Sequence, residues 1–358
     1  MWVGEIGGLE KYVLQLSTAL KEHEYDVEIC VLFKGGPVSY EARRRGIKVH
    51  IIGLRNGFDL VRAFRFFKLI RVGGIYDVFH VHDRNFLANL MLSIICKGKK
   101  VFTEHGGELI SGRSQKRFFF YKLLAFQYSK IIANSEYIKK VLVGRGLVFS
   151  EKVLVVHNGI ESEKAPDSSK ETIKRNLKIA ADKKVIGVIA RMVPAKGVDL
   201  FIDVAKKIAQ TKNNFVFLVV GGGPMKQEYE KLAARDSGIA DIRFLGWRTD
   251  IGDILSVLDA YMFTSRWEPF GISLVEAMMA GVPIAGFNIP GANEILVKDE
   301  TSLLVEPFDT NMLSEKVILL TRDELLRSKF INNGRRLSND RYSIKRNSER
   351  IIEIYKDL

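Results

Sequence analysis

The chain has 358 residues, of which 47% are hydrophobic and 27% are charged. This composition is that of a soluble globular protein and excludes a disordered or fibrous chain. At roughly 150 residues per domain, the length predicts two domains. No apolar stretch approaches the roughly 18 residues of a membrane span. No signal peptide is recognisable, and the only cysteines are Cys30 and Cys96, so we exclude membrane-spanning and disulfide-stabilised proteins and expect a cytosolic protein with reduced thiols.

Positive charge is concentrated in the first half of the chain. The net charge is +13, and residues 1–164 contribute +10 of it, from 26 basic and 16 acidic residues. Residues 43–145 alone carry 21 basic and 6 acidic residues, interleaved with phenylalanines. This mixture fits an acidic lipid surface or nucleic acid, and it equally fits the solvated faces of ordinary helices. Because the sequence contains no groove-reading motif, we do not expect nucleic-acid binding.

Short apolar runs alternate with segments of helical period, a pattern typical of parallel sheets covered by helices. The first half predicts strands at 27–33, 48–53, 77–82, 100–104, 130–133 and 153–156, and a polar stretch at 161–170 predicts a linker. The second half predicts strands at 184–190, 215–221, 242–245, 260–264, 283–286 and 302–305. We expect an α/β protein of two doubly wound, Rossmann-like domains that face a cleft. The domains are predicted at 1–164 and 165–340, with a last helix at 341–358 that can pack back on the first domain.

Several residues of the first half stand at predicted strand ends or turns. The turn at Gly7 and Gly8 leads into a helix, and His105 closes the strand at 100–104. A histidine there could act as a base or as a hydrogen-bond donor to a reacting sugar, although a lone histidine is more often structural. His80 and His82 alternate on a strand beside Asp83, which fits a metal site, but no further ligand cluster accompanies them. We therefore expect no metal.

The predicted helix at 59–71 is amphipathic and basic. At 100° per residue its apolar residues fill one side, and its basic residues, including Arg62, Arg65 and Lys68, spread over the other. The apolar side fits packing on the first domain's sheet. The basic side would then draw the domain toward anionic lipid.

Two motifs of the second half suit a phosphate ligand. In ARMVPAKGVD, Arg191 follows a predicted strand and Lys196 precedes a new helix, so two cations converge at a strand's carboxyl end. Arginine offers a bidentate fork and lysine a point charge, which together suit a diphosphate leaving group. In VVGGGP, Gly221 and Gly222 permit close approach of a ligand, and a tight structural turn explains them equally well.

The most informative segment is SRWEPFGISLVEAMMAGVP, residues 265–283. It predicts a helix from Ile272 to Ala280, ended by glycine and proline, directly after a strand. The helix N-terminus offers free N–H groups and a positive dipole end for phosphate, and Gly271 lets the backbone come close. Glu276, about one turn inside, could accept both ribose hydroxyls, while Glu268 is left in the turn to meet a sugar. A plain surface helix with an N-terminal glutamate is the alternative.

Taken together, these motifs closely resemble the family-4 retaining glycosyltransferases, which have the two-Rossmann-domain GT-B fold. The resemblance rests on the E-x7-E pair Glu268 and Glu276, on ARMVPAKGVDL, VVGGGPM, FLGW and HNGI, and on the early GGLEKYVLQLSTAL. It implies that Glu276 holds the donor ribose, that Arg191 and Lys196 hold the donor diphosphate, and that Glu268 holds the transferred sugar. It also implies that the backbone of Phe270, Gly271 and Ile272 contacts the same sugar and that Gly221 and Gly222 lie at the donor. On the first domain it implies that Gly7 and Gly8 form an acceptor-side loop and that His105 lies near the reacting carbon.

The resemblance also implies a metal-independent enzyme with no cofactor, and the chain contains no Asp-x-Asp pair. One departure concerns the start, because only MWVGEI precedes Gly7 where the family has a full strand at the centre of the first sheet. We expect either a start further upstream or an impaired first domain with an unpaired strand edge.

The sequence thus predicts a hexosyl-transferring enzyme that uses a nucleotide-sugar. Its acceptor would be a lipid-linked glycan or a polysaccharide in cell-surface glycan biosynthesis, and it would work at the inner face of the plasma membrane. Two alternatives remain at this point. One is a nucleotide-sugar epimerase of the same fold, which would turn over the donor without an acceptor. The other is an inactive nucleotide-sugar-binding partner subunit.

Overall fold

The computed structural model describes residues 7–56, 59, 61–62, 64–66, 68, 76–82, 86–95, 98–106, 115–163, 168–212, 214–235 and 239–358. The chain divides into two compact units. Unit 1 comprises Met1–Glu161 and Tyr342–Leu358, and unit 2 comprises Ser162–Arg341. All the predicted strands, β1 to β12, are confirmed, with ends that differ from the predicted ones by no more than two residues. No helix of the described ranges is long and apolar enough to cross a membrane.

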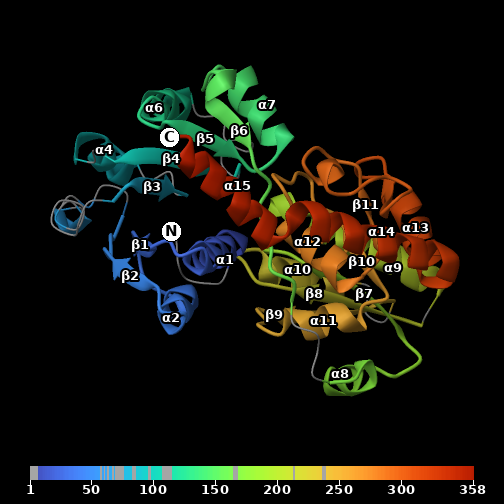
Figure 1. Cartoon of the computed structure of the whole chain (residues 1–358). Helices are drawn as coiled ribbons and strands as arrows, with labels where there is room; N and C mark the ends of the chain where they lie inside the picture. The colour runs from blue at the N-terminus through green and yellow to red at the C-terminus, as the bar shows by residue number, and fades with distance from the viewer. Residues whose placement is uncertain are drawn as a thin grey trace. The chain divides into compact units, whose positions relative to one another are not determined.

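Unit 1 contains two parallel sheets (Figure 1). β1 (Glu28–Val31) pairs with β2 (Lys48–Ile51), and a second sheet has the order β3 (Val78–Val81), β4 (Lys99–Glu104), β5 (Lys130–Ala133), β6 (Val153–Val155). Its helices are α1 (Gly8–Glu22), α2 (Pro37–Arg44), α4 (Phe86–Ile95), α6 (Gln115–Ala125), α7 (Glu136–Gly144) and α15 (Ile344–Lys356), with a 3-10 turn at Ser150–Lys152. Among the described residues no strand joins the two sheets. The six residues before Gly7, where the missing strand was expected, lie outside the described part, and so does part of the helix expected at 59–71.

Helix α7 illustrates how the sequence positions the elements of unit 1. It begins after Ser135, whose hydroxyl accepts a hydrogen bond from the Ile138 amide at 3.2 Å, and Glu136 stands in its first turn. Both features stabilise a helix N-terminus. Ile138 and Leu142, one turn apart, are fully buried in a cluster with residues of β4, β5 and β6. The capped start and the i, i+4 apolar pair therefore lay α7 on the second sheet.

Helix α15 belongs to unit 1 although it ends the chain. The Tyr12 hydroxyl on α1 donates to Asn347 Oδ1 on α15 at 3.2 Å, and Asn347 Nδ2 donates to His157 O at 2.6 Å. A Cβ on Gly159 would lie 2.4 Å from the Asn347 Cβ. Glycine in the HNGI motif thus lets the last helix approach the chain that follows β6.

Unit 2 is a single six-stranded parallel sheet with helices on both faces (Figure 1). Its order is β12 (Ser302–Val305), β11 (Ile284–Phe287), β10 (Ala260–Phe263), β7 (Lys184–Ile189), β8 (Phe215–Val220), β9 (Asp241–Gly246). The central strands are near-continuous apolar runs because both faces are covered. The helices are α8 (Lys170–Asn176), α9 (Val198–Thr211), α10 (Lys226–Ala234), α11 (Ile251–Val257), α12 (Ile272–Ala280), α13 (Thr310–Arg322) and α14 (Glu324–Tyr342), with 3-10 turns at Pro194–Lys196 and Ala292–Glu294.

The strand order of unit 2 reverses at β7. From β7 the chain proceeds through β8 to β9 on one side, and it then returns to β10 on the other side of β7 and continues to β12. Helices α9 and α13 pack together on one face, whereas α12 packs against β11 together with α11. The loops after β7 and β10 therefore leave the sheet on opposite faces at its carboxyl edge, the position at which such sheets bind their ligands.

Candidate functional site

The donor residues predicted for unit 2 follow neighbouring strands. Arg191 and Lys196 follow β7, the two glycines Gly221 and Gly222 follow β8, and the segment from Glu268 to Glu276 follows β10. Because β10, β7 and β8 are adjacent and parallel, these loops meet at the same edge of the sheet. The residues thus gather at the reversal point of the strand order.

Lys196 and Glu268 are in direct contact across this reversal point. Lys196 Nζ donates to Glu268 Oε2 at 2.5 Å, although the two residues are 72 positions apart. The Glu268 side chain is 8% exposed and that of Lys196 is 26% exposed. A carboxylate that is this deeply buried needs a cationic partner, and Lys196 provides it. Arg191, by contrast, is exposed at the same edge.

The predicted helix over Ile272–Ala280 is confirmed as α12. Gly271 precedes it in the left-handed region at φ 104°, and no side chain caps the helix start. The Leu274 amide donates to Gly271 O at 3.0 Å, and the N–H groups of Ile272 and Ser273 stand before it at the positive end of the helix dipole. Phe270 is buried beside the turn, and Glu276 is buried one turn inside the helix. Gly281, at φ 77°, ends it.

A buried tyrosine that sequence reasoning missed joins β7 to α12. The Tyr261 hydroxyl accepts from the Ile189 amide at 3.1 Å and lies 3.0 Å from both Ile189 O and Ser273 Oγ. Burial raises the pKa of Tyr261 above its usual range. The only sequence signal was a tyrosine on a predicted buried strand, which suggests a hydroxyl in need of a partner. Its contacts hold the end of β7 at a set distance from the first turn of α12.

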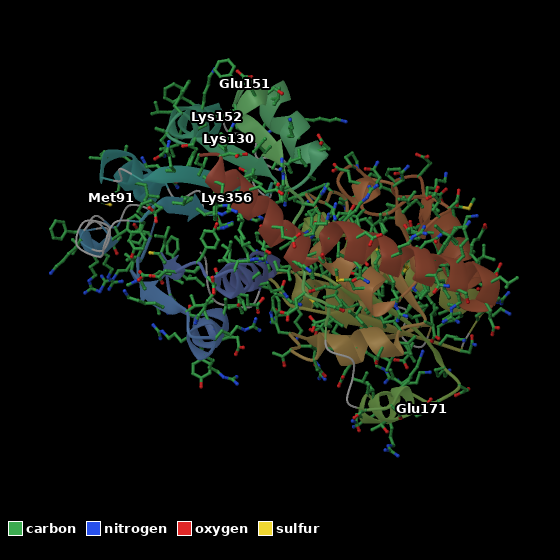
Figure 2. The ribbon with its side chains drawn as sticks, viewed as in Figure 1. Met91, Lys130, Glu151, Lys152, Glu171 and Lys356 are labelled. Atoms are coloured by element: carbon green, nitrogen blue, oxygen red, sulfur yellow. The ribbon has the colours of Figure 1, made fainter. Side chains whose placement is uncertain are left out.

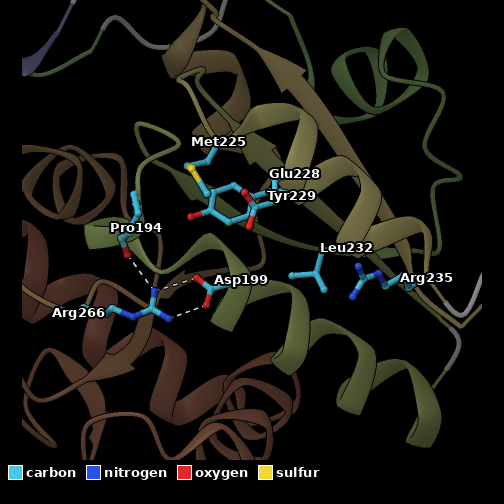
Figure 3. A pocket seen from close by; sticks show the side chains of 8 residues that line it. All are labelled: Pro194, Asp199, Met225, Glu228, Tyr229, Leu232, Arg235 and Arg266. Carbon is cyan, nitrogen blue, oxygen red and sulfur yellow. Dashed lines mark hydrogen bonds and ion pairs between the residues drawn. The ribbon is translucent and has the colours of Figure 1, made fainter.

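Arg266, also missed from the sequence, ties the two donor loops together (Figure 3). Its guanidinium donates to both carboxylate oxygens of Asp199, at 2.8 and 2.5 Å, and to Pro194 O at 2.9 Å. Its amide donates to Ala195 O at 2.8 Å. Hydrogen bonding to Arg266 lowers the pKa of Asp199. The loop that carries Lys196 and the loop that carries Glu268 are thus joined by Arg266 as well as by their own ion pair.

A pocket of about 400 Å³ lies behind these loops, between α9 and α10 (Figure 3). It is lined by Pro194, Asp199, Met225, Glu228, Tyr229, Leu232, Arg235 and Arg266. None of the residues predicted to bind the donor lines it. Three lining residues, Pro194, Met225 and Arg266, belong to the loops after β7, β8 and β10.

The glycines after β8 are needed for contacts within the protein. A Cβ on Gly221, at φ 124°, would lie 2.2 Å from Ala190 O, and one on Gly222 would lie 2.2 Å from Trp247 Nε1. These close approaches account for glycine at both positions without a ligand. They also bring Trp247, 42% exposed after β9, to the β8 loop. Sequence reasoning cited Trp247 only as part of FLGW.

Three histidines of unit 1, His80, His82 and His105, lie in contact at the carboxyl ends of β3 and β4. His105 Nε2 lies 3.2 Å from His82 Nδ1, and His80 contacts Thr103 Oγ1 at 2.6 Å and the Tyr355 hydroxyl at 2.5 Å. Burial lowers the pKa of His82 to about 3. Burial, and then the neighbouring His82 and His105, lower the pKa of His80 well below its usual value.

The contacts of His80 concern the metal site that the sequence suggested at His80, His82 and Asp83. Two hydroxyl groups occupy both ring nitrogens of His80. No group of three or more metal-ligating side chains occurs within the described ranges. Asp83 lies outside them.

Gly7 precedes α1 and Gly8 is its first residue, so the predicted turn at these glycines leads directly into the helix. Gly7 is extended at φ −89° and has no capping side chain. A Cβ on Gly7 would lie 2.5 Å from Glu10 Oε2. Glu10 is buried in the first turn, where a carboxylate faces the positive end of the helix.

The protein is thus an α/β protein of two compact units, and the second unit gathers Arg191, Lys196 and the start of α12 at one edge of its sheet. Two family profiles match the chain: Glycosyltransferase Family 4 over residues 6–164 and Glycosyl transferases group 1 over residues 169–337. The chain belongs to this family, and it is a glycosyltransferase of GT-B fold.

Individual relatives agree with this assignment. An Escherichia coli UDP-Gal:alpha-D-GlcNAc-diphosphoundecaprenol alpha-1,3-galactosyltransferase is 24% identical, over 99% of this chain and 94% of its own length. A Staphylococcus aureus capsular polysaccharide biosynthesis glycosyltransferase is 28% identical, over 68% of this chain and 66% of its own. Among solved structures, HepE of Anabaena in complex with UDP and glucose superposes with a TM-score of 0.87 at 22% identity, covering 100% of this chain and 98% of that one.

Proposed function

We propose that the protein transfers a hexose from a uridine diphosphate sugar to a lipid-linked or polysaccharide acceptor, with retention of configuration. The observation that carries the proposal is the contact between Lys196 and Glu268 at 2.5 Å, at the reversal point of the sheet and beside the uncapped start of α12. This contact brings a cation and a carboxylate together beside the N-terminus of α12, which supports the binding of a diphosphate sugar at this edge. The preference for uridine is supported by the relatives, because the E. coli enzyme is named for UDP-Gal and HepE was solved with UDP.

The chemistry assigned to these groups is a same-face displacement. The bond between the anomeric carbon and the diphosphate oxygen breaks, and a bond from that carbon to the acceptor hydroxyl oxygen forms on the same face. The acceptor's proton passes to the departing phosphate oxygen. Lys196, Arg191 and the N–H groups of α12 stabilise the negative charge that grows on the leaving diphosphate. Glu276 holds the ribose and Glu268 orients the sugar, and His105 is the residue of unit 1 that we assign to catalysis.

Metal independence is part of the proposal. A divalent cation in such enzymes neutralises the leaving diphosphate. Here the side chains of Arg191 and Lys196, together with the dipole of α12, are available for that task. The proposal therefore includes no cofactor.

The proposal also places the enzyme in the cytosol at the inner face of the plasma membrane. The E. coli relative is named for an acceptor linked to undecaprenol diphosphate, and a polyprenyl carrier stays in the bilayer. The +15 charge of residues 43–145 supports attraction to an anionic leaflet.

Donor binding is tested first by thermal unfolding with UDP-, GDP- and ADP-sugars. We expect the UDP-sugars alone to raise the unfolding temperature, because a ligand that binds the folded state stabilises it by mass action. Transfer is then measured with lipid-linked acceptors. Turnover of the donor into an epimer without acceptor would identify an epimerase, and binding with neither transfer nor hydrolysis would identify a partner subunit.

The residue assignments are tested with Glu276→Ala and Lys196→Ala. Each removes a charged partner of the donor, so transfer should fall by roughly 10² to 10³ fold if the group stabilises the transition state. Glu315→Ala and Lys231→Ala are matched controls on exposed positions of α13 and α10. Circular dichroism should show all four variants folded. Wild-type transfer rates in both site variants would contradict the assignment.

A further inference from the structure

The imidazole rings of His82 and His105 meet where β3 and β4 end. His82 Nδ1 lies 3.2 Å from His105 Nε2, and the ring centres are 5.5 Å apart with the ring planes tilted by 35°. At this distance two imidazoles form one N–H···N hydrogen bond, in which one ring donates and the other accepts at a lone pair. The contact therefore determines which nitrogen of His105 carries the proton.

The surroundings of His82 favour one direction for this hydrogen bond. Because burial lowers the pKa of His82 to about 3, its ring is neutral near neutral pH and has one N–H and one lone pair. An N–H at His105 Nε2 can donate to His82 Nδ1 whether His105 is neutral or protonated. The reverse direction needs an unprotonated Nε2 and is lost as soon as His105 gains a proton. Donation from His105 to His82 is therefore the direction that suits both states of His105.

His80 packs on the ring of His82 and is itself held at both ring nitrogens. The two ring centres are 4.2 Å apart, with the planes tilted by 30°. His80 Nε2 contacts Thr103 Oγ1 at 2.6 Å, and His80 Nδ1 contacts the Tyr355 hydroxyl of α15 at 2.5 Å. Figure 2 labels Lys356, which follows Tyr355 on this helix. With His80 fixed by β4 and α15, its contact with His82 restricts the rotation of the His82 ring.

The turn that carries His105 is also held in place. The Gly106 amide donates to Oε1 of the fully buried Glu104 at 2.6 Å, and Gly106 lies in the left-handed region at φ 84°. The buried ring of Tyr12 on α1 stands edge-on to both imidazoles, with centre distances of 5.9 Å to His82 and 5.6 Å to His105. Elements of unit 1 thus hold both partners of the pair, as a preorganised site requires.

We propose that His82 is a positioning residue that fixes the tautomer of His105 by accepting a hydrogen bond from His105 Nε2–H at its own Nδ1. Neutral His105 then carries its proton at Nε2 and its lone pair at Nδ1. The inference rests on the proposed function, in which His105 is assigned to catalysis. A lone pair at Nδ1 suits a sugar that develops positive charge in the transition state, whereas an N–H at that atom would oppose this charge.

The hydrogen bond is tested by NMR on the whole chain, with isotopic labels at the histidine ring nitrogens. The chain has six histidines, so single substitutions assign their signals. An N–H···N hydrogen bond produces a scalar coupling between its two nitrogens. Near neutral pH we expect this coupling between His105 Nε2 and His82 Nδ1, and nitrogen chemical shifts that identify the Nε2–H tautomer of His105. Absence of the coupling, or a proton at His105 Nδ1, would overturn the proposal.

The effect on sugar transfer is tested with two substitutions of His82. His82→Phe keeps a ring that can pack on His80 but has no hydrogen-bond acceptor. His82→Asn places an amide oxygen near the position of Nδ1 and can still accept from His105. The matched control is His50→Phe, which removes a histidine hydrogen bond elsewhere in unit 1, that of His50 Nε2 with Glu28 Oε2 at 2.7 Å.

We expect kcat to fall by roughly 10 to 10² fold in His82→Phe, because a catalytic imidazole in a mixture of tautomers and orientations is less often in the reactive state. The KM for the UDP-sugar should change little, since His82 is not assigned to donor binding. His82→Asn should regain most of the lost kcat, and His50→Phe should match wild type. The nitrogen shifts of His105 should indicate a mixture of tautomers in His82→Phe and a single tautomer in His82→Asn.

Two kinetic outcomes would also overturn the proposal. Wild-type kcat in His82→Phe would show that His105 needs no partner, and an equal loss of kcat in both His82 variants would show that the ring matters and the acceptor does not. Thermal melts should show every variant folded, and the coupling in wild type needs no variant to be stable. If wild type transfers no sugar, the proposed function fails, and the coupling still decides whether His82 fixes the tautomer of His105.

Discussion

Replacement of Glu268 by glutamine should tighten the binding of UDP while it slows sugar transfer. In the structure Glu268 Oε2 accepts a hydrogen bond from Lys196 Nζ at 2.5 Å. Lys196 is the cation that we assign to the donor diphosphate. Glutamine keeps the shape of the side chain and can still accept from Lys196, but it removes the competing negative charge. The lysine then meets the diphosphate with its charge uncompensated.

The magnitude follows from the geometry of the pair. Two unit charges about 4 Å apart attract by about 4 kcal/mol at an effective dielectric constant of 20, and the contact of 2.5 Å between Lys196 Nζ and Glu268 Oε2 is closer than that. Lys196 is 26% exposed, so solvent screening and desolvation reduce the net value toward about 1 to 2 kcal/mol. This corresponds to UDP binding about 5 to 30 times more tightly in Glu268→Gln. Transfer should fall by roughly 10² fold, since the carboxylate is assigned to the reacting sugar.

The assay is calorimetric titration of UDP into wild type, Glu268→Gln and the control Glu315→Gln, an exposed position on α13. Transfer rates are measured with the same preparations. The tightening should shrink as ionic strength rises, because it is electrostatic. Unchanged or weaker UDP binding by Glu268→Gln would refute the reasoning, since it would show that Lys196 does not contact the diphosphate.

Three further predictions follow from the contacts described. Arg266→Lys keeps the charge but loses the bidentate geometry, so kcat/KM should fall about tenfold with little change in unfolding temperature, and wild-type kinetics would show that the loops do not need this tie. His82 has a folded pKa of about 3, below its unfolded value near 6.5, so the unfolded state binds the extra proton and stability falls as pH drops below about 6.5. We measure the free energy of unfolding with urea at pH 7.5 and at pH 5.5. Between these pH values it should fall in wild type and in the exposed-site control His23→Asn, and the fall in His82→Asn should be smaller by about 1.4 kcal/mol. Equal falls in all three proteins would contradict the prediction. Finally, EDTA should leave transfer intact, and a requirement for added magnesium or manganese would count against metal independence.

Much of the fold was readable from local sequence pattern. The strands of unit 2 are short apolar runs separated by turn residues, and the helix over Ile272–Ala280 is bounded by Gly271 and Gly281. Such signals are local, because burial on both faces selects apolar runs and positive φ selects glycine. Arg191, Lys196, Glu268 and Glu276 all follow predicted strands, so the sequence by itself predicts that they lie at one edge of one sheet.

Contacts between distant residues were decided by tertiary structure alone. Arg266 and Asp199 are 67 positions apart, and Lys196 and Glu268 are 72 apart. They meet because β10 lies beside β7, and that adjacency depends on the whole strand order. The sequence assigned Lys196 and Glu268 separately to a ligand, but it did not show that they pair with each other.

The same distinction applies to α6. Its sequence predicted clustered aromatics among basic residues, and helical period alone does not tell which of two apolar sides is covered. Packing resolves this, because Ala125 is buried in the core while Phe119 and Phe126 remain exposed. The sequence by itself thus determined the strands, the glycine-bounded helix and the charged residues at the strand ends, all of which depend on neighbours in the chain. Tertiary structure determined which of those residues pair and which apolar side remains in water, because both depend on elements far away in the sequence.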